Sequence, residues 1–332
     1  MLQIMRQLIA AADILRNGGL VAFPTETVYG LGADATNPAA VRRIFQLKGR
    51  PLTNPLIVHV ADAAMARRFA DPWPEVADRL AERFWPGPLT LVVGKAPAIV
   101  AEATAGLNSV ALRCPRHPLA LELLRIFDGP VAAPSANRST RISPTTAQHV
   151  RDEFGDTIDC ILDGGPCEVG IESTVLDLTG PVPTILRPGQ VTAEELETIV
   201  APVVTATRTV DDSQPASSPG QQAVHYAPLA PAYRFEPAQW PAVNAWCQSH
   251  QQQRWALMTL GQRRSPTSRV PTAGRVLAMP PAPADYARQL YCVLRQLDAE
   301  AVHSIWIEMP PDEPQWAAVR DRLLRATRPA PL

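Results

Sequence analysis

The chain has little lysine, no closely spaced cysteines and no long apolar run. Only two of its 31 basic residues, Lys48 and Lys95, are lysines. Its five cysteines contain no Cys-x-x-Cys pair, which argues against a disulfide framework or a zinc site. No apolar stretch reaches the roughly 18 residues of a membrane-spanning helix, and the amphipathic N-terminus carries Asp13, unlike a secretion signal. We therefore expect a cytoplasmic protein with no membrane segment.

The charge balance argues against a dedicated nucleic-acid binder. The formal net charge is −1, and residues 1–205 hold 18 basic and 22 acidic side chains. Residues 206–332 hold 13 basic and 10 acidic ones. Neither part has the strong basic excess that is typical of nucleic-acid-binding domains. This charge balance is still compatible with a local basic groove and with weak tRNA binding.

The hydrophobic pattern predicts two α/β domains. In residues 1–204, helix-like and strand-like segments alternate irregularly, and some strands follow one another directly, which favours a twisted, mixed parallel and antiparallel open sheet. Residues 205–231 are rich in Ser, Pro, Gly and Gln, as in a linker. Residues 232–332 alternate again and predict a smaller α/β domain with parallel strands. In the first domain we predict helices at about 4–17, 38–47, 74–84, 117–127, 144–153 and 193–199.

The first candidate site combines Lys48 and Arg50 in the segment KGR. Nearly all other basic residues of the chain are arginine, so the lysine at this position is unusual. A lysine ammonium group is a compact charge that suits binding to a phosphate group. No GxxxxGK[ST] motif is present, so this is not a P-loop enzyme. No Ser-His-Asp or Cys-His set stands out either. We therefore predict catalysis by positioning and charge neutralisation, with Lys48 and Arg50 as the candidate catalytic residues.

Further polar residues lie near the ends of other predicted strands. Arg113 follows an apolar strand and either clamps a carboxylate or makes an internal salt bridge. His59 in LIVHV is either a core residue or a ligand. Ser143 is either a helix N-cap or a phosphate ligand. Together these residues predict a polar ligand site at strand ends, where open α/β sheets commonly bind ligands.

The sequence resembles the threonylcarbamoyl-AMP synthase family, the YrdC-type enzymes of tRNA modification. The resemblance covers roughly residues 8–200, and SPG....HYAP at Ser218–Pro228 resembles the linker of the family's longer, two-domain branch, whose C-terminal domain is Rossmann-like. The linker here lacks the Lys and Arg that commonly precede its His-Tyr pair. Seven segments match the family's motifs in order: FPTETVYGLGADA, KGRP..NPLIVHV, PGPLTLV, VALRCPRHP, PSAN.S...SPT, GIESTV.DL and ILRPG.

This resemblance implies a reaction. L-threonine, bicarbonate and ATP would give threonylcarbamoyl-AMP and pyrophosphate, and a tRNA threonylcarbamoyl transferase would pass the group to adenosine 37 of ANN-decoding tRNAs. Mg²⁺ would accompany ATP, with ligands that the sequence does not reveal, and the linker would act as a lid through Tyr226. The residues implied for L-threonine are Thr27, His59, Arg113, Ala133 and Ser173, and those for ATP are Lys48, Arg50, Asn54, Ser109, Ser135, Ser143, Arg187 and Tyr226.

Three other functions compete with this one. The first is a carbamoyl-adenylating domain like those of hydrogenase-maturation carbamoyltransferases, which are longer and carry Cys-rich zinc motifs that this chain lacks. The second is a double-stranded RNA or tRNA-binding module, which a steep salt dependence of tight RNA binding would support. The third is a ribosome-associated structural factor, for which no feature of the sequence speaks directly.

Overall fold

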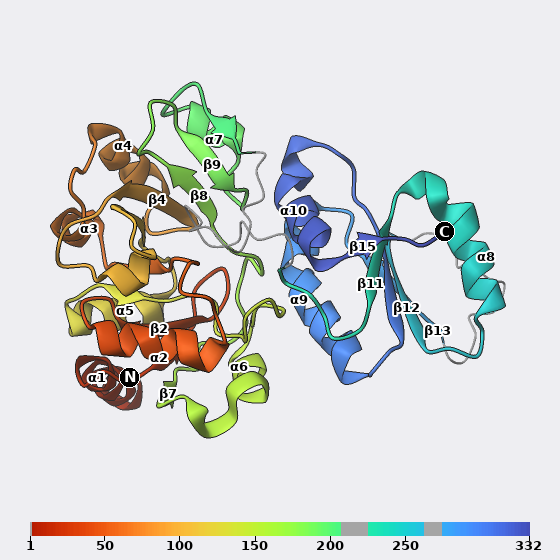
Figure 1. The fold of residues 1–332 in the computed structure, drawn as a ribbon, viewed down its shortest axis with the longest axis horizontal. Helices are drawn as coiled ribbons and strands as arrows, with labels where there is room; N and C mark the ends of the chain where they lie inside the picture. The colour runs from red at the N-terminus through yellow and green to blue at the C-terminus, as the bar shows by residue number, and fades with distance from the viewer. Residues whose placement is uncertain (1, 207–224, 262–273) are drawn as a thin grey trace. The chain divides into compact units, whose positions relative to one another are not determined.

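The computed structural model of the chain describes residues 2–206, 225–261 and 274–332, which fall into two compact units (Figure 1). The first unit holds the described residues up to 206 except Thr140–Ile142, and the second holds Thr140–Ile142 and the described residues from 225 onward. Most of the predicted linker, at 207–224, lies outside the described residues. Each unit is described by itself below.

The first unit contains a mixed sheet with the order β10-β9-β8-β4-β5-β3-β6-β2-β1-β7 among its described residues. Four strand pairs are parallel and the others antiparallel, so the predicted mixed sheet is confirmed. The strands are β1 (Val21–Phe23), β2 (Gly30–Asp34), β3 (Ile57–His59), β4 (Leu89–Gly94), β5 (Ser109–Arg113), β6 (Val131–Ala132), β7 (Cys160–Ile161), β8 (Thr174–Asp177), β9 (Thr184–Arg187) and β10 (Val204–Thr205).

The helices of this unit show why its local sequence folds as it does. Helix α2 (Pro38–Lys48) begins after Asn37, whose side chain accepts hydrogen bonds from two backbone N–H groups, and ends at Gly49 with φ +61°. Helix α3 (Ala63–Phe69) was not predicted from the sequence, whereas the others lie close to the predicted ranges. These others are α1 (Leu2–Arg16), α4 (Glu75–Phe84), α5 (Pro118–Phe127), α6 (Ala147–Phe154) and α7 (Ala193–Glu197), with 3-10 turns η1 (Ala101–Thr104) and η2 (Gly155–Thr157).

The two faces of the sheet differ in what they carry. Successive side chains of a strand point to opposite faces. Val58 and Leu112 belong to the main apolar core, which also includes the buried residues of the helices. The residues before them, Ile57 and Ala111, form a separate, smaller apolar cluster with Val92 and Val175. We call the side of β3, β4, β5 and β8 that carries this smaller cluster the site face.

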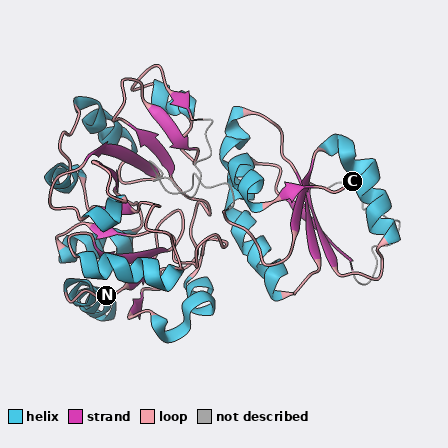
Figure 2. Ribbon diagram, viewed as in Figure 1, coloured by secondary structure: helices cyan, strands magenta, loops and turns pink. Residues whose placement is uncertain are grey.

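The second unit is built around a sheet with the order β13-β12-β14-β11-β15, in which every described strand pair is parallel, as predicted. Helix α8 covers one face, and α9 and α10 cover the other (Figure 1; Figure 2). Trp306 packs against Trp246 at a ring-centroid distance of 4.4 Å in its core. The elements are β11 (Ala232–Phe235), η3 (Pro237–Gln239), α8 (Trp240–Ser249), β12 (Trp255–Leu260), β13 (Gly274–Met279), α9 (Pro283–Ala299), β14 (Ser304–Glu308), η4 (Pro314–Trp316), α10 (Ala317–Ala326) and β15 (Arg328–Pro329).

The sequence predicts neither a membrane-spanning helix nor a disulfide framework, and the described residues bear on both. Among these residues, the longest apolar stretches within helices fall short of what a bilayer crossing requires. All five cysteines are free, and three of them are buried.

Candidate active site

Strands β3 and β5 place His59 and Arg113 side by side. The two residues are directly paired in the parallel register, at the last positions of their strands, and both are buried. They therefore project from the same face, the site face. Ala133, just after β6, lies beside Ile57 at the other end of β3, because its backbone N–H donates to the carbonyl of Ile57 at 2.8 Å.

Arg113 makes a buried ion pair with Glu26, which comes from the loop after β1. The Glu26 Oε1 accepts from Arg113 Nη2 at 2.8 Å, and its Oε2 accepts from the backbone N–H of Arg116 at 3.0 Å. Among the described residues, the buried Nε of Arg113 has no hydrogen-bond partner. The internal salt bridge is thus present, and the guanidinium still holds a donor that a carboxylate can accept.

His59 is kept uncharged at neutral pH. Burial, and next the positive charge of Arg113, lower its pKa from 6.5 to about 3. Its Nδ1 is buried without a hydrogen-bond partner among the described residues. The site face therefore offers a neutral imidazole next to a cation.

A backbone hydrogen bond joins the two segments that carry Thr27 and Ser173. The N–H of Gly170 donates to the carbonyl of Thr27 at 3.2 Å, which holds the segment before β8 against the loop after β1. Ser173 is fully buried, and its Oγ lies 2.8 Å from the hydroxyl oxygen of Thr90 on β4. Of the five residues predicted for L-threonine, strand register thus places His59, Arg113 and Ala133 on the site face. Ser173 contacts Thr90 there, and Thr27 is linked to the segment before β8 through Gly170.

Lys48 organises a neighbouring loop. Its Nζ donates to the carbonyls of Ser135, at 2.6 Å, and of Asn137, and its own carbonyl accepts from the N–H of Ser139 at 2.8 Å. Burial, and next the charge of Arg50, lower the pKa of Lys48 well below 10.5. An added anion would favour its charged form.

Arg50 and Asn54 form a second buried pair next to Lys48 in sequence. The Arg50 Nη2 donates to Asn54 Oδ1 at 2.5 Å, and its Nε donates to the Asn54 carbonyl at 3.0 Å. The Nδ2 of Asn54 has no partner among the described residues, although it is buried. That amide is a donor available to a ligand oxygen.

Ser143 and Arg187 reach the residues before β8. The hydroxyl of Ser143 donates to Glu172 at 2.5 Å, and Arg187 donates to both the carbonyl (3.1 Å) and the Oγ (3.2 Å) of Ser173. Ser143 is not the N-cap of helix α6, because Thr146 occupies that position and accepts from the N–H at the third helical position. A predicted ATP residue, Arg187, thus touches a predicted threonine residue.

Two predicted ATP residues are not part of these contacts. Ser109 projects from the same face of β5 as Arg113 but at the other end of the strand, roughly 13 Å away. Tyr226 belongs to the second unit, where it is fully buried and stacks on Tyr291 with ring centroids 5.7 Å apart.

Three buried residues that contact the site were absent from the predicted set: Glu26, Thr90 and Glu172. Each stands inside a segment that resembles a family motif, and each is a polar residue in a largely apolar or small-residue context. A polar residue in such a context could have been recognised from the sequence as a candidate site residue. What the sequence could not give is the partner of each, since those partners lie 87, 83 and 29 residues away.

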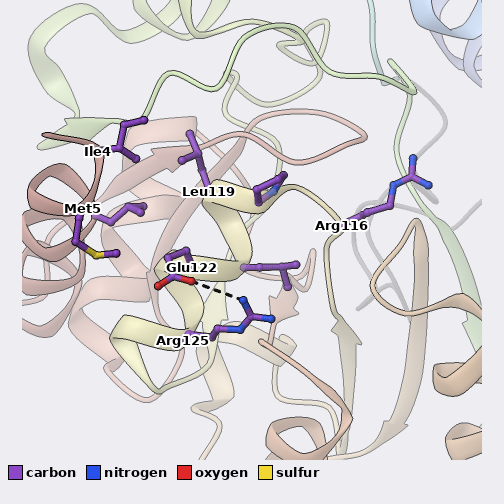
Figure 3. Close-up of a pocket in the computed structure, with 9 residues that line it drawn as sticks. Ile4, Met5, Arg116, Leu119, Glu122 and Arg125 are labelled. Atoms are coloured by element: carbon purple, nitrogen blue, oxygen red, sulfur yellow. Dashed lines mark ion pairs between the residues drawn. The ribbon is translucent and has the colours of Figure 1, made fainter. Parts of the chain in front are cut away.

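A groove elsewhere on the first unit has a different character. Helices α1 and α5 border a cavity of about 390 Å³ (Figure 3). Apolar side chains such as Ile4, Met5 and Leu119 line it together with the ion pair of Glu122 and Arg125. It contains none of the predicted site residues, so it is not the candidate active site.

The described residues contain no group of three or more His, Cys, Asp or Glu side chains that could hold a metal ion. A Mg²⁺ ion prefers oxygen ligands and commonly binds to substrate phosphates while keeping several waters.

The comparisons with known proteins cover both units. The Sua5/YciO/YrdC family model, described as "Telomere recombination", matches residues 13–189, and the model "Threonylcarbamoyl-AMP synthase, C-terminal domain" matches residues 191–327. The chain is 42% identical over 325 residues to the threonylcarbamoyl-AMP synthase of Bacillus subtilis, covering 96% of this chain and 92% of that protein. It is 49% identical over 224 residues to that of Pyrococcus abyssi, covering 66% and 65%.

A solved structure is similar over nearly the whole length. The crystal structure of P. abyssi Sua5 complexed with L-threonine matches with a TM-score of 0.88 and 39% identity, covering 96% of this chain and 94% of that chain.

Proposed function

The chain belongs to the Sua5/YciO/YrdC family, in the branch with the threonylcarbamoyl-AMP synthase C-terminal domain, and we propose that its site face is where threonine and ATP react. Its activity is that of a threonylcarbamoyl-AMP synthase, a nucleotidyltransferase that serves t6A modification of tRNA. The contact of Arg187 with Ser173 carries the proposal, because it joins the residues predicted for ATP to those predicted for threonine.

L-threonine binds with its carboxylate on Arg113. The unpartnered Nε of Arg113 supports this, because a guanidinium donates readily to a carboxylate. Thr27, Ala133 and Ser173 line the remainder of the amino-acid site, and the neutral His59 adds no charge that would repel a cationic amine. The amine reacts with bicarbonate to give a carbamate with loss of water.

ATP binds beside the amino acid, and its α-phosphorus is attacked by the carbamate oxygen as pyrophosphate leaves. Lys48, Arg50 and Arg187 neutralise the phosphate charges. The Nδ2 of Asn54 supplies a neutral donor. Mg²⁺ enters with the nucleotide as a counter-ion to its phosphates. Ser109, Ser135 and Ser143 complete the nucleotide site.

The proposal also covers the domain division of the chain, the enzyme that receives the product, and contact with tRNA. The catalytic domain comprises residues 1–204, followed by the linker 205–231 and the smaller domain 232–332. The product passes to a tRNA threonylcarbamoyl transferase. Direct contact with tRNA is weak, since residues 1–205 carry more acidic than basic side chains.

Mass spectrometry of the product from ATP, bicarbonate and L-threonine tests the proposal. We expect Lys48→Ala to abolish pyrophosphate release and Arg113→Ala to weaken threonine binding by about 30- to 1000-fold, the loss of roughly 2–4 kcal/mol for a charged clamp. The matched control is Arg116→Ala, because the Arg116 side chain is exposed and pairs with Glu168. Threonine affinity that survives in Arg113→Ala would overturn the threonine assignment.

A further inference from the structure

Thr90 is a buried polar residue in an otherwise apolar strand, LTLVVG. Its side chain projects from the site face, because Thr90 is paired with Val175, a member of the cluster that defines that face. Its hydroxyl oxygen lies 2.8 Å from Ser173 Oγ, and both residues are fully buried. Ser173 is the only partner that the Thr90 hydroxyl has among the described residues.

The direction of this hydrogen bond follows from counting donors and acceptors. Arg187 can only donate, so Ser173 Oγ accepts from its Nη2 at 3.2 Å. In the free protein either hydroxyl can donate to the other, and each direction leaves one of the two buried hydrogens without an acceptor among the described residues. An acceptor oxygen of a bound amino acid beside Ser173 makes the two directions unequal. If Thr90 accepted, its own hydrogen would stay unpaired, which costs about 1–3 kcal/mol. If Thr90 donates, the Ser173 hydrogen pairs with the ligand oxygen, so with the amino acid bound Thr90 donates to Ser173.

We propose that Thr90 is a positioning residue, which acts with Arg187 to make Ser173 a hydrogen-bond donor to an acceptor oxygen of the bound amino acid. The inference rests on the proposed function, in which Ser173 contacts L-threonine. Without the Thr90 hydroxyl, one acceptor position of Ser173 Oγ has no donor. The O–H bond of Ser173 can then rotate toward that position. The substrate oxygen then meets a hydroxyl that is no longer held in the donating orientation.

Two substitutions separate the hydroxyl of Thr90 from its shape. Thr90→Val keeps the volume and removes the donor, whereas Thr90→Ser keeps the donor and removes a methyl group. We expect Thr90→Val to raise the KM for L-threonine by about 5-fold, the value of one neutral hydrogen bond, and to leave the KM for ATP within about 2-fold. Thr90→Ser keeps both values near wild type. The opposite pattern, a harmful Ser and a harmless Val, would assign Thr90 to packing and overturn the proposal.

A second comparison asks whether Thr90 acts through Ser173. In a Ser173→Ala background, Thr90→Val has no serine hydroxyl to orient, so we expect it to raise the KM for L-threonine no further. An additional 5-fold rise in that background would overturn the proposal. Thr90→Ala, which also lacks the hydroxyl, repeats the test if the valine variant folds poorly.

Thr104→Val is the matched control for the loss of a buried threonine hydroxyl. Thr104 is buried in the same unit, and among the described residues its hydroxyl bonds only to the backbone carbonyls of Ala101 and Leu107. Thr104→Val should lower thermal stability about as much as Thr90→Val does, but it should leave the KM values for L-threonine and ATP unchanged. Calorimetric titration of the full chain with L-threonine separates the two levels of inference. Absence of binding to wild type would overturn the proposed function, whereas equal binding to wild type, Thr90→Val and Thr90→Ser would overturn the role of Thr90 alone.

Discussion

His59 illustrates how much of the site depends on the surroundings of a single residue. Its place in the apolar run LIVHV favours a core role, with a ligand role as the alternative. The structure gives it features of both, because it packs edge-on against Phe23 at 5.7 Å while its Nδ1 remains without a partner among the described residues. A short sequence window contains neither the ring nor the neighbouring Arg113.

The pKa of His59 predicts a pH dependence of stability. Unfolding returns the pKa from about 3 to 6.5, so between these values the unfolded state binds more protons than the folded state. The stability that the folded state gains by keeping His59 neutral is fully present above pH 6.5 and is lost as the pH falls toward 3. We expect the free energy of unfolding to drop between pH 7 and pH 5, and to drop less in His59→Gln. Urea denaturation of both proteins at the two pH values measures this, and parallel drops would contradict it.

The sequence offers residue types for a site but not the contacts between them. Arg113 and Lys48 are proposed as site residues from motif position and from the rarity of lysine. The ion pair of Arg113 with Glu26 could not be predicted, since it joins residues 87 positions apart and depends on how β5 is placed in the sheet. Such long-range contacts follow from the strand order, which local patterns do not encode.

At the scale of elements, short segments were the hardest to predict. Helix α3 has only seven residues, too few for an apolar period to stand out, although Asp62 caps it by accepting from the Met65 N–H at 2.7 Å. The strand β3 lies between β5 and β6 with no direct connection to either. Strands of two or three residues carry too little pattern to fix such neighbours.

The loop after β9 makes a close approach that only glycine permits. A Cβ at Gly189 would lie 2.2 Å from the backbone nitrogen of Thr174, at the start of β8. We expect Gly189→Ala to destabilise the fold by about 1–3 kcal/mol and to raise the KM for threonine, because it would push Arg187 away from Ser173. Thermal unfolding and initial rates measure the two effects.

Gly180→Ala is the control for this change, because its Cβ would meet only the carbonyl oxygen of Val182, at 3.9 Å. It should leave stability and rates near wild type. If Gly189→Ala behaved like Gly180→Ala, the close approach would not matter for the site.

At the scale of the whole molecule, the two units have separate apolar cores. The domain division predicted from the sequence rests on an alternation of strands and helices that stops in a Pro- and Ser-rich segment and then resumes. Parallel strands in the second unit followed from that alternation, since parallel neighbours need crossover connections. The strand order in either unit did not follow from it.

Separate cores predict separate responses to ligand and mutation. We expect L-threonine to raise the unfolding temperature of the first unit, and Trp306→Ala to lower that of the second by removing a buried aromatic side chain, a loss of roughly 3–5 kcal/mol. Threonine affinity should be unchanged in Trp306→Ala. Differential scanning calorimetry of the full chain measures both shifts, and a single transition moved by both changes would argue against independent cores.

The distribution of the cysteines has a practical consequence. Burial raises the pKa of Cys114 and Cys247 to about 12 and that of Cys167 further, so these thiols do not ionise at neutral pH. Cys160 is half-buried with a raised pKa, and Cys292 on α9 is the one exposed thiol of the five. Because only the thiolate reacts with electrophiles, a maleimide dye should attach at Cys292. The native chain thus offers a single labelling position for fluorescence measurements, without any engineered residue.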